Sequence, residues 1–197
     1  MKILVTGFEP FGKDNRNISW EVAQELLSDN FLGQHIEIKC LPVSFKKVGR
    51  ALCDEIDRTA PNVLIMLGQS SHRQQINVER IAINIMDSKA PDNDGYSPID
   101  IPVCENSEIA YFSTAPIKDI CRALNDANLE AKVTNSAGTY VCNTTYYEAL
   151  NYNAKHGNNI TMCFIHLPSL DKSPEKISQF KQAIEITIQT IIKKCYS

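Results

Sequence analysis

The N-terminus of the chain lacks a long hydrophobic run. Residues 1–7 hold a short apolar stretch with one cation, too short for the core of a signal peptide or for a membrane span. The sequence also lacks a cluster of lysine and arginine, and its formal net charge is -3 over 197 residues. Because nucleic-acid phosphates require several cations on one face, these absences argue against a nucleic-acid partner. We expect a cytoplasmic protein that contacts neither nucleic acid nor membrane.

Paired cysteines and clustered histidines are absent as well. The seven cysteines are an odd, scattered set without a Cys-x-x-Cys pair, which predicts reduced thiols in a chain that has no export signal. His35, His72 and His156 lie beside polar or loop residues and have no His or Glu partner four residues away. This spacing argues against a metal site, and we expect no metal.

Short runs rich in valine and isoleucine alternate with longer stretches of helical period, which is typical of a sheet covered by helices on both faces. With 43% hydrophobic residues, the chain suits one domain, residues 1–197. The segment 87–114 is irregular and reads as a long loop of the kind that often carries function. The expected strands are residues 2–6, 36–42, 62–68, 81–86, 131–135 and 160–166, and the expected helices are residues 19–29, 45–59, 117–128, 142–154 and 174–194.

Residues 7–13 imitate a phosphate-binding loop with their Gly-x-x-x-x-Gly-Lys spacing. A working loop needs Ser or Thr after the lysine to hold magnesium, whereas this chain has Asp14, whose charge repels phosphate. Pro10 also removes an amide that a phosphate cradle would use. Phe8 and Phe11, at the C-terminal end of an expected strand, suit either an apolar pocket wall or the protein core.

Cys142 lies in Ser-Ala-Gly-Thr-Tyr-Val-Cys-Asn, between an expected strand and an expected helix, and therefore at or near a helix N-terminus. Exposed amides and the helix dipole favour a thiolate at such a place, and the same amides can hold an oxyanion. The alternative is a buried structural cysteine, because cysteine often behaves as a small hydrophobic residue.

His166 ends an apolar run at the edge of an expected strand, where it is either a base for a thiol or a structural residue. Glu79 precedes the alternating apolar residues Ile81, Ile83 and Ile85 by an even number of positions. Its side chain is therefore expected on the same inward face as theirs. A buried carboxylate is costly unless a partner compensates it. That partner is either a histidine, which would complete a Cys-His-acid arrangement, or Arg80 or Arg73 in an ion pair.

Six motifs occur in order along the chain. They are Thr-Gly-Phe-Glu-Pro-Phe-Gly at 6–12, Glu-Arg-Ile-Ala-Ile-Asn at 79–84, Pro-Asp-Asn-Asp-Gly at 91–95, Ala-Tyr-Phe-Ser-Thr at 110–114, the Cys142 segment, and Phe-Ile-His-Leu-Pro at 164–168. Together they resemble the pyroglutamyl peptidase I (pyrrolidone-carboxylate peptidase) family, from the first strand to the last helix. The resemblance implies a single-domain three-layer α/β/α sandwich with a mixed, mostly parallel central sheet, assembled as a homotetramer or dimer.

The resemblance further implies a cysteine peptidase that removes N-terminal pyroglutamyl residues from peptides through a thioester. Cys142 would be the nucleophile, His166 the general base and acid, and Glu79 the group that orients the imidazole. No metal or organic cofactor is required. The positions that it implies for the substrate pocket are Phe8, Phe11, Asn17, Gln69, Lys89, Ala90, Tyr140 and Val141.

The sequence departs from the family pattern at this pocket. Lys89-Ala90 stands where the family usually has Arg-Ile, which removes a bulky wall and a guanidinium, so we expect a wider pocket. The stretch after Pro168 is also shorter than in relatives. Two other functions stay open: a nucleotide-binding enzyme built on residues 7–13, and a non-catalytic or altered-specificity relative that binds a small amide ligand.

Overall fold

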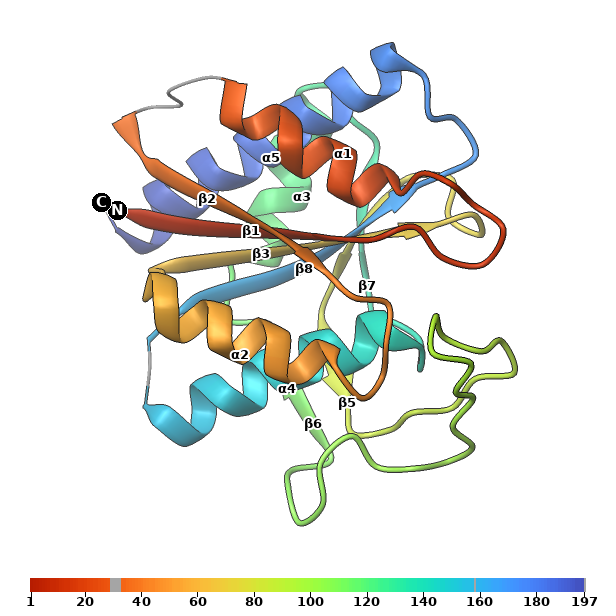
Figure 1. Ribbon diagram of the computed structural model, residues 1–197. Helices are drawn as coiled ribbons and strands as arrows, with labels where there is room; N and C mark the ends of the chain where they lie inside the picture. Colours follow the sequence, from red (N-terminus) through yellow and green to blue (C-terminus); the bar gives the residue numbers. More distant parts are fainter. Residues whose placement is uncertain (29–32, 158, 197) are drawn as a thin grey trace.

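The computed structural model describes residues 1–28, 33–157 and 159–196. In these ranges the central sheet has six strands in the order β2-β1-β3-β8-β4-β7 (Figure 1). Neighbouring strands run parallel except for β4 and β8, which are antiparallel. The predicted α/β fold with a mixed, mostly parallel sheet is therefore confirmed. The bounds are β1 Lys2–Phe8, β2 His35–Leu41, β3 Val63–Ser70, β4 Ile76–Glu79, β7 Ala131–Thr134 and β8 Thr161–Pro168.

Helices cover both faces of this sheet (Figure 1). Side chains alternate along each strand: in β8, Cys163 and Ile165 join one core cluster, while Met162 and Phe164 join the other. Both faces are buried, which explains why the strands read as continuous apolar runs. None of the helices in the described part of the chain is long and apolar enough to cross a membrane. One face carries α1 Ile18–Glu25, α3 Ile117–Asp126 and α5 Pro174–Cys195, and the other carries α2 Val48–Thr59 and α4 Val141–His156.

The strand predicted at residues 81–86 exists only in part, as β5 at Ile81–Ile83, and it lies outside the main sheet. The strand that enters the main sheet is β4, Ile76–Glu79, and the chain then leaves the sheet. Residues Ile81–Ile83 form β5, which pairs with β6, Ala110–Phe112, in a separate two-stranded ribbon. The alternation of apolar residues after Glu79 therefore reflects packing of this ribbon beside α4.

Two other elements differ from the prediction. The helix expected at residues 19–29 is α1 followed by a short 3₁₀ turn, η1 Leu26–Ser28, and residue 29 lies outside the described ranges. The irregular segment 87–114 holds β6, and its first part is tied down by an isolated bridge between Met86 and Ile101. This segment lies beside the end of the sheet at which β1 and β3 terminate (Figure 1).

Candidate active site

The parallel strands β1, β3 and β8 are neighbours in the middle of the sheet, so their C-terminal ends lie together. Ligands of open α/β sheets bind outside these strand ends. A cavity of about 700 Å³ opens there. Its walls come from the strand ends, the loop after β1, the start of the 87–114 segment and the turn before α4. Among the residues that line it are Phe8, Phe11, Asn17, Gln69, Ala90, Tyr140, Val141, Cys142 and His166, all singled out by the sequence.

Cys142 is the second residue of α4, and its half-buried side chain lines the cavity. The amides of Asn143 and Thr144 donate to the Tyr140 carbonyl at 3.0 and 3.2 Å. The first amides of a helix have no partner within the helix, so those of Val141 and Cys142 face out of its N-terminus. This end of a helix favours a thiolate and an oxyanion.

Asn143, beside the cysteine, is a site residue that the sequence analysis missed. Its buried amide nitrogen donates to the carbonyls of Ile83 and Ile85 at 2.8 and 3.0 Å, and its amide oxygen accepts from the Ile83 N–H at 3.0 Å. These bonds attach the start of α4 to β5 and so fix the position of Cys142 in the cavity wall. Only the position of Asn143 next to the cysteine could have signalled this role.

His166 and Glu79 lie on the antiparallel pair of β8 and β4. Asn77 pairs with His166 and Glu79 pairs with Phe164, so these four side chains share the sheet face that α4 covers. The Nδ1 atom of His166 is 2.8 Å from Oε1 of Glu79, and both residues are buried. The Thr134 hydroxyl donates to the other carboxylate oxygen of Glu79 at 2.5 Å.

The imidazole of His166 has partners on both sides. Burial lowers its pKa, but hydrogen bonds to Cys142 and Glu79, together with the charges of these groups, outweigh burial and raise the pKa to about 9. A protonated imidazole at neutral pH is the partner that a thiolate needs. Elsewhere in the chain, burial raises the pKa of the Cys53 and Cys163 thiols to about 12, which keeps them protonated.

The apolar walls come from the loop after β1 and the turn before α4. Phe8 is buried at the end of β1, and the ring of Phe11 lies 6.0 Å from the ring of Tyr140. Glu9, between the two phenylalanines, accepts a hydrogen bond at 2.8 Å from the Asn93 amide, which comes from the Pro-Asp-Asn-Asp-Gly motif. Two of the family-like motifs thus hold each other in place at the mouth of the cavity.

Asn17 and Gln69 line the cavity, yet protein groups occupy part of their polar atoms. Gln69 Oε1 accepts from the Ile18 N–H at 3.1 Å. Asn17 caps α1 by accepting from the Ser19 N–H at 3.1 Å, and its amide nitrogen donates to the Glu9 carbonyl at 2.9 Å. Both side chains therefore have a fixed orientation in the cavity wall.

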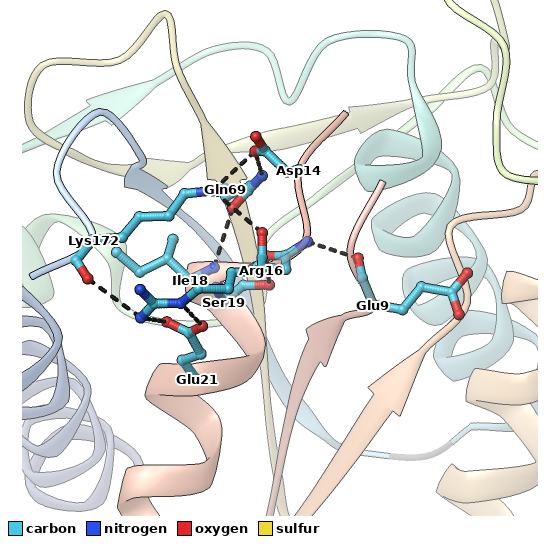
Figure 2. A network of polar contacts seen from close by, with 9 residues as sticks. Glu9, Asp14, Arg16, Ile18, Ser19, Glu21, Gln69 and Lys172 are labelled. Atoms are coloured by element: carbon cyan, nitrogen blue, oxygen red, sulfur yellow. Dashed lines mark hydrogen bonds and ion pairs between the residues drawn. The ribbon is translucent and has the colours of Figure 1, made fainter. Parts of the chain in front are cut away.

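Asp14 stands where a phosphate loop has Ser or Thr. Its carboxylate forms hydrogen bonds with neighbouring side chains of the protein (Figure 2). Its carboxylate accepts from Gln69 Nε2 at 3.1 Å and from Lys172 Nζ at 2.9 Å. Hydrogen bonds from Lys172 and Gln69, with the charge of Lys172, lower the pKa of the exposed Asp14 carboxyl. Lys172 also donates to the Arg16 carbonyl at 3.2 Å, so the loop after β1 is joined to the short segment after β8.

The phosphate-loop spacing of residues 7–13 has a packing explanation. Gly7 lies within β1, where a Cβ atom would come within 2.6 Å of the Ser19 backbone at the start of α1. The amides of the loop are also occupied, because Phe8 N–H donates to Ser19 Oγ and Glu9 N–H donates to the Leu41 carbonyl, each at 3.0 Å. A phosphate would find no free amide in this half of the loop.

Lys89 is the one expected pocket residue that does not line the cavity. The Ser88 hydroxyl donates to the Ala90 carbonyl at 2.8 Å and accepts from the Ala90 N–H at 3.2 Å. This tight turn brings Ser88 and Ala90 to the cavity and leaves Lys89 exposed to solvent. The expected contact of Lys89 with the pocket is therefore absent from the structure.

Of the two arginines that the sequence offers as partners of Glu79, Arg73 is the one that reaches it. Arg73 Nη2 lies 3.4 Å from Glu79 Oε1, whereas Arg80 Nε donates to Asn135 Oδ1 at 2.7 Å. Glu79 thus has both kinds of partner that were expected as alternatives, a histidine and an arginine. Within the described ranges, no three His, Cys, Asp or Glu side chains are grouped so that they could share a metal ion.

The chain is similar to known proteins over almost its whole length. A family model described as pyroglutamyl peptidase matches residues 1–195. Relatives named pyrrolidone-carboxylate peptidase include one from Thermococcus onnurineus, which is 44% identical with 98% of this chain and 100% of the relative covered. A relative named pyrrolidone-carboxylate peptidase 1, from Caldanaerobacter subterraneus, is 43% identical with 98% of each chain covered.

Solved structures of similar proteins superpose over almost the whole chain. The pyrrolidone carboxyl peptidase from Thermococcus litoralis has a TM-score of 0.91 and 32% identity, with 98% of this chain and 93% of that chain covered. Pyroglutamyl peptidase I from Bacillus amyloliquefaciens has a TM-score of 0.91 and 31% identity, with 98% and 97% covered. The chain therefore belongs to the pyroglutamyl peptidase family of cysteine peptidases.

Proposed function

We propose that this chain removes the pyroglutamyl residue from the N-terminus of peptides, with Cys142 as nucleophile, His166 as general base and acid, and Glu79 as the carboxylate that orients the imidazole. The observation that carries the proposal is the 2.8 Å bond between His166 and Glu79, next to a thiol at a helix N-terminus and at the wall of one cavity. Membership of the family supports the pyroglutamyl specificity.

The reaction proceeds through an acyl-enzyme. The Cys142 thiolate attacks the pyroglutamyl carbonyl carbon, and the amides of Val141 and Cys142 donate to the oxyanion that forms. The imidazolium of His166 gives its proton to the departing amine, the C–N bond breaks, and a pyroglutamyl thioester remains. His166 then accepts a proton from water, the hydroxide attacks the thioester, and pyroglutamate leaves as the thiolate is restored. Glu79 keeps the imidazole in the required orientation and tautomer throughout.

The cavity suits an uncharged ring. Phe8, Phe11 and Val141 supply apolar walls, and none of the described residues that line the cavity is Asp or Glu. A free α-ammonium group would be desolvated there without an acidic partner, whereas a lactam carries no charge. The second N–H of the Gln69 amide, which Asp14 leaves available, is a suitable donor to the lactam oxygen. Asn17, which bonds to the Glu9 carbonyl and the Ser19 N–H, holds the backbone next to Gln69 in place.

Hydrolysis of a pyroglutamyl arylamide by the purified, reduced protein tests the proposal. We expect turnover by the wild-type protein and by Cys195→Ser, a control at an exposed thiol, and loss of turnover in Cys142→Ser. Prolyl arylamide, which has a five-membered ring but a charged amine and no lactam oxygen, should not be cleaved. With limiting iodoacetamide, Cys142 should be labelled first of the seven cysteines. Absence of turnover by the reduced wild-type protein would refute the proposal.

We also propose that the chain assembles as a homotetramer or dimer and acts in the cytoplasm. Three large apolar side chains in or beside the long loop are exposed, namely Ile99 at 78%, Ile109 at 86% and Phe112 at 67%, and a subunit contact would cover them. A thiolate nucleophile and seven unpaired cysteines suit a reducing compartment. Sedimentation equilibrium tests the assembly, and a monomer at micromolar concentration would contradict it.

A further inference from the structure

We propose that Arg73 is a positioning residue, which holds the carboxylate of Glu79 and the turn before Cys142 in one fixed arrangement. The inference rests on the proposed function, because it assigns Arg73 to the machinery of Cys142, His166 and Glu79. Arg73 lies in the segment between β3 and β4 and lines the cavity. It touches neither the nucleophile nor the imidazole in the hydrogen-bond network, so it acts through other groups.

The guanidinium of Arg73 joins three places in the chain. Its Nη2 atom lies 3.4 Å from Glu79 Oε1 and donates to the Ser136 carbonyl at 3.1 Å. With the Asn77 amide oriented so that both of its ends are satisfied, Asn77 Oδ1 accepts from Arg73 Nη1 at 2.8 Å and from Nε at 3.1 Å. One planar fork therefore connects two residues of β4 with the turn that leads into α4.

These partners surround His166. Asn77 pairs with His166 across the two strands, and Glu79 Oε1, the oxygen 3.4 Å from Arg73, is also the oxygen bonded to His166 Nδ1 at 2.8 Å. Glu79 is fully buried and the Arg73 side chain is 28% exposed, so water competes little for these bonds. Hydrogen bonds between charged groups in such a place are stronger than those between neutral groups. Arg73 thereby determines where the orienting oxygen lies.

The Ser136 carbonyl gives Arg73 its second role. Residues 135–140 connect β7 to α4, and their backbone sets the position of the helix end that carries Cys142. By donating to both Glu79 and Ser136, Arg73 couples the acid and base strands to the nucleophile. Lysine would retain the charge, but a single ammonium group cannot reproduce a fork that reaches Asn77, Glu79 and Ser136 together.

The occupied donors argue against direct substrate binding by Arg73. A guanidinium has five N–H groups, and the bonds to Asn77, Glu79 and Ser136 use four of them. We therefore expect a change in kcat, with KM for a small substrate nearly unchanged. Arg80 offers a matched control, because it is also an arginine beside Glu79 in sequence but bonds to Asn135 on an exposed surface.

The test compares Arg73→Ala, Arg73→Lys and Arg80→Ala in hydrolysis of a pyroglutamyl arylamide. We expect kcat to fall roughly 10-fold to 100-fold in Arg73→Ala and at least about 5-fold in Arg73→Lys, with KM within about 2-fold of wild type. Guanidinium ion at low millimolar concentration should restore part of the rate to Arg73→Ala and should not affect Arg80→Ala. A merely structural role would lower the melting temperature without this rescue.

Alkylation of Cys142 by iodoacetamide provides a second readout that needs no turnover. Its rate at neutral pH should fall in Arg73→Ala and Arg73→Lys and recover in part with guanidinium for the former. Wild-type protein that fails to cleave the reporter refutes the proposed function, while the alkylation rates still decide the role of Arg73. Wild-type kcat in either Arg73 variant, or a change confined to KM, overturns the inference. Arg73→Lys retains the charge and the side-chain stem, so it serves if Arg73→Ala does not fold.

Discussion

Replacing Gly68 with alanine tests whether the rate depends on the exact place of the His166 ring. Gly68 pairs with His166 in the register of β3 and β8. A Cβ atom at this position would lie 2.9 Å from Phe164 Cε1 and 3.0 Å from His166 Cδ2. Ordinary contacts begin near 3.4 Å, so the rings must retreat by about 0.4 to 0.5 Å. Phe164 is fully buried against Phe8 and Tyr146, which leaves the His166 ring to move.

The size of the effect follows from this displacement. A misplacement of 1 Å in a catalytic arrangement can cost about 100-fold in rate, so half of that distance predicts a loss of about 10-fold in kcat/KM for Gly68→Ala. Overpacking a filled core also lowers the free energy of unfolding by about 1–3 kcal/mol. KM should change less than kcat, because the walls formed by Phe8 and Phe11 stay in place. Hydrolysis of the pyroglutamyl reporter and urea denaturation measure the two effects.

A control separates the loss of rate from the loss of stability. Ile188→Val removes one methyl group from α5, on the opposite face of the sheet, and should cost about 0.5–1.5 kcal/mol. We expect this variant to keep wild-type kcat/KM. If Gly68→Ala also keeps wild-type kcat/KM, the close contact does not move the imidazole and the reasoning is refuted.

Four further predictions concern the acid, the pocket and the pH dependence. Glu79→Gln should keep the circular dichroism spectrum and lose roughly 10-fold to 100-fold in kcat/KM, and an unchanged value would show that the orienting role is misassigned. Ala90→Ile should lower KM for small substrates by filling the cavity, whereas an unaltered KM would place residue 90 away from the ring. Asp14→Asn weakens the grip on Gln69 and should raise KM about 2-fold to 5-fold at unchanged kcat; a selective fall in kcat would contradict this. The pKa of His166 is raised from 6.5 to about 9 in the folded chain, so protonated His166 stabilises the folded state fully below pH 6.5, and this stabilisation is lost as the pH rises through 9. The free energy of unfolding, measured by urea denaturation between pH 6 and 10, should fall accordingly. A flat profile would contradict this prediction.

Local patterns carry much of this fold and site. The buried strands β1, β3 and β8 are apolar on both faces, so their sequences identify them without reference to partners. The position of Cys142 at a helix N-terminus follows from the turn residues before it and the helical period after it. The apolar run of β8 likewise identifies the strand that carries His166, although β8 extends to Pro168, beyond the expected end at residue 166. Hydrophobic periodicity and turn-forming residues involve only a few neighbouring positions, which is the separation that a sequence pattern can express.

The tertiary structure decided which polar residues belong inside. β4 contains Asn77 and Glu79, whose burial is favourable because His166 and Arg73 bond to them. Arg73 is near Glu79 in the sequence and was a candidate partner for that reason, whereas His166 lies 87 residues away, and no local pattern contains that pairing. The direction of Lys89 likewise depends on a turn closed by the Ser88 hydroxyl.

By itself, the sequence determined the α/β pattern, the helix N-terminus at Cys142 and the motifs that resemble one family of peptidases. Only the tertiary structure decided that Glu79 lies in the main sheet, that Asp14 and Lys172 join the loop after β1 to the segment after β8, and that Arg73 bridges the acid and the nucleophile turn. The physical reason is the sequence separation over which each interaction acts. The periods of strands and helices arise between near neighbours, whereas a buried charge such as Glu79 is bonded to a residue far away in the chain, which only the fold brings close.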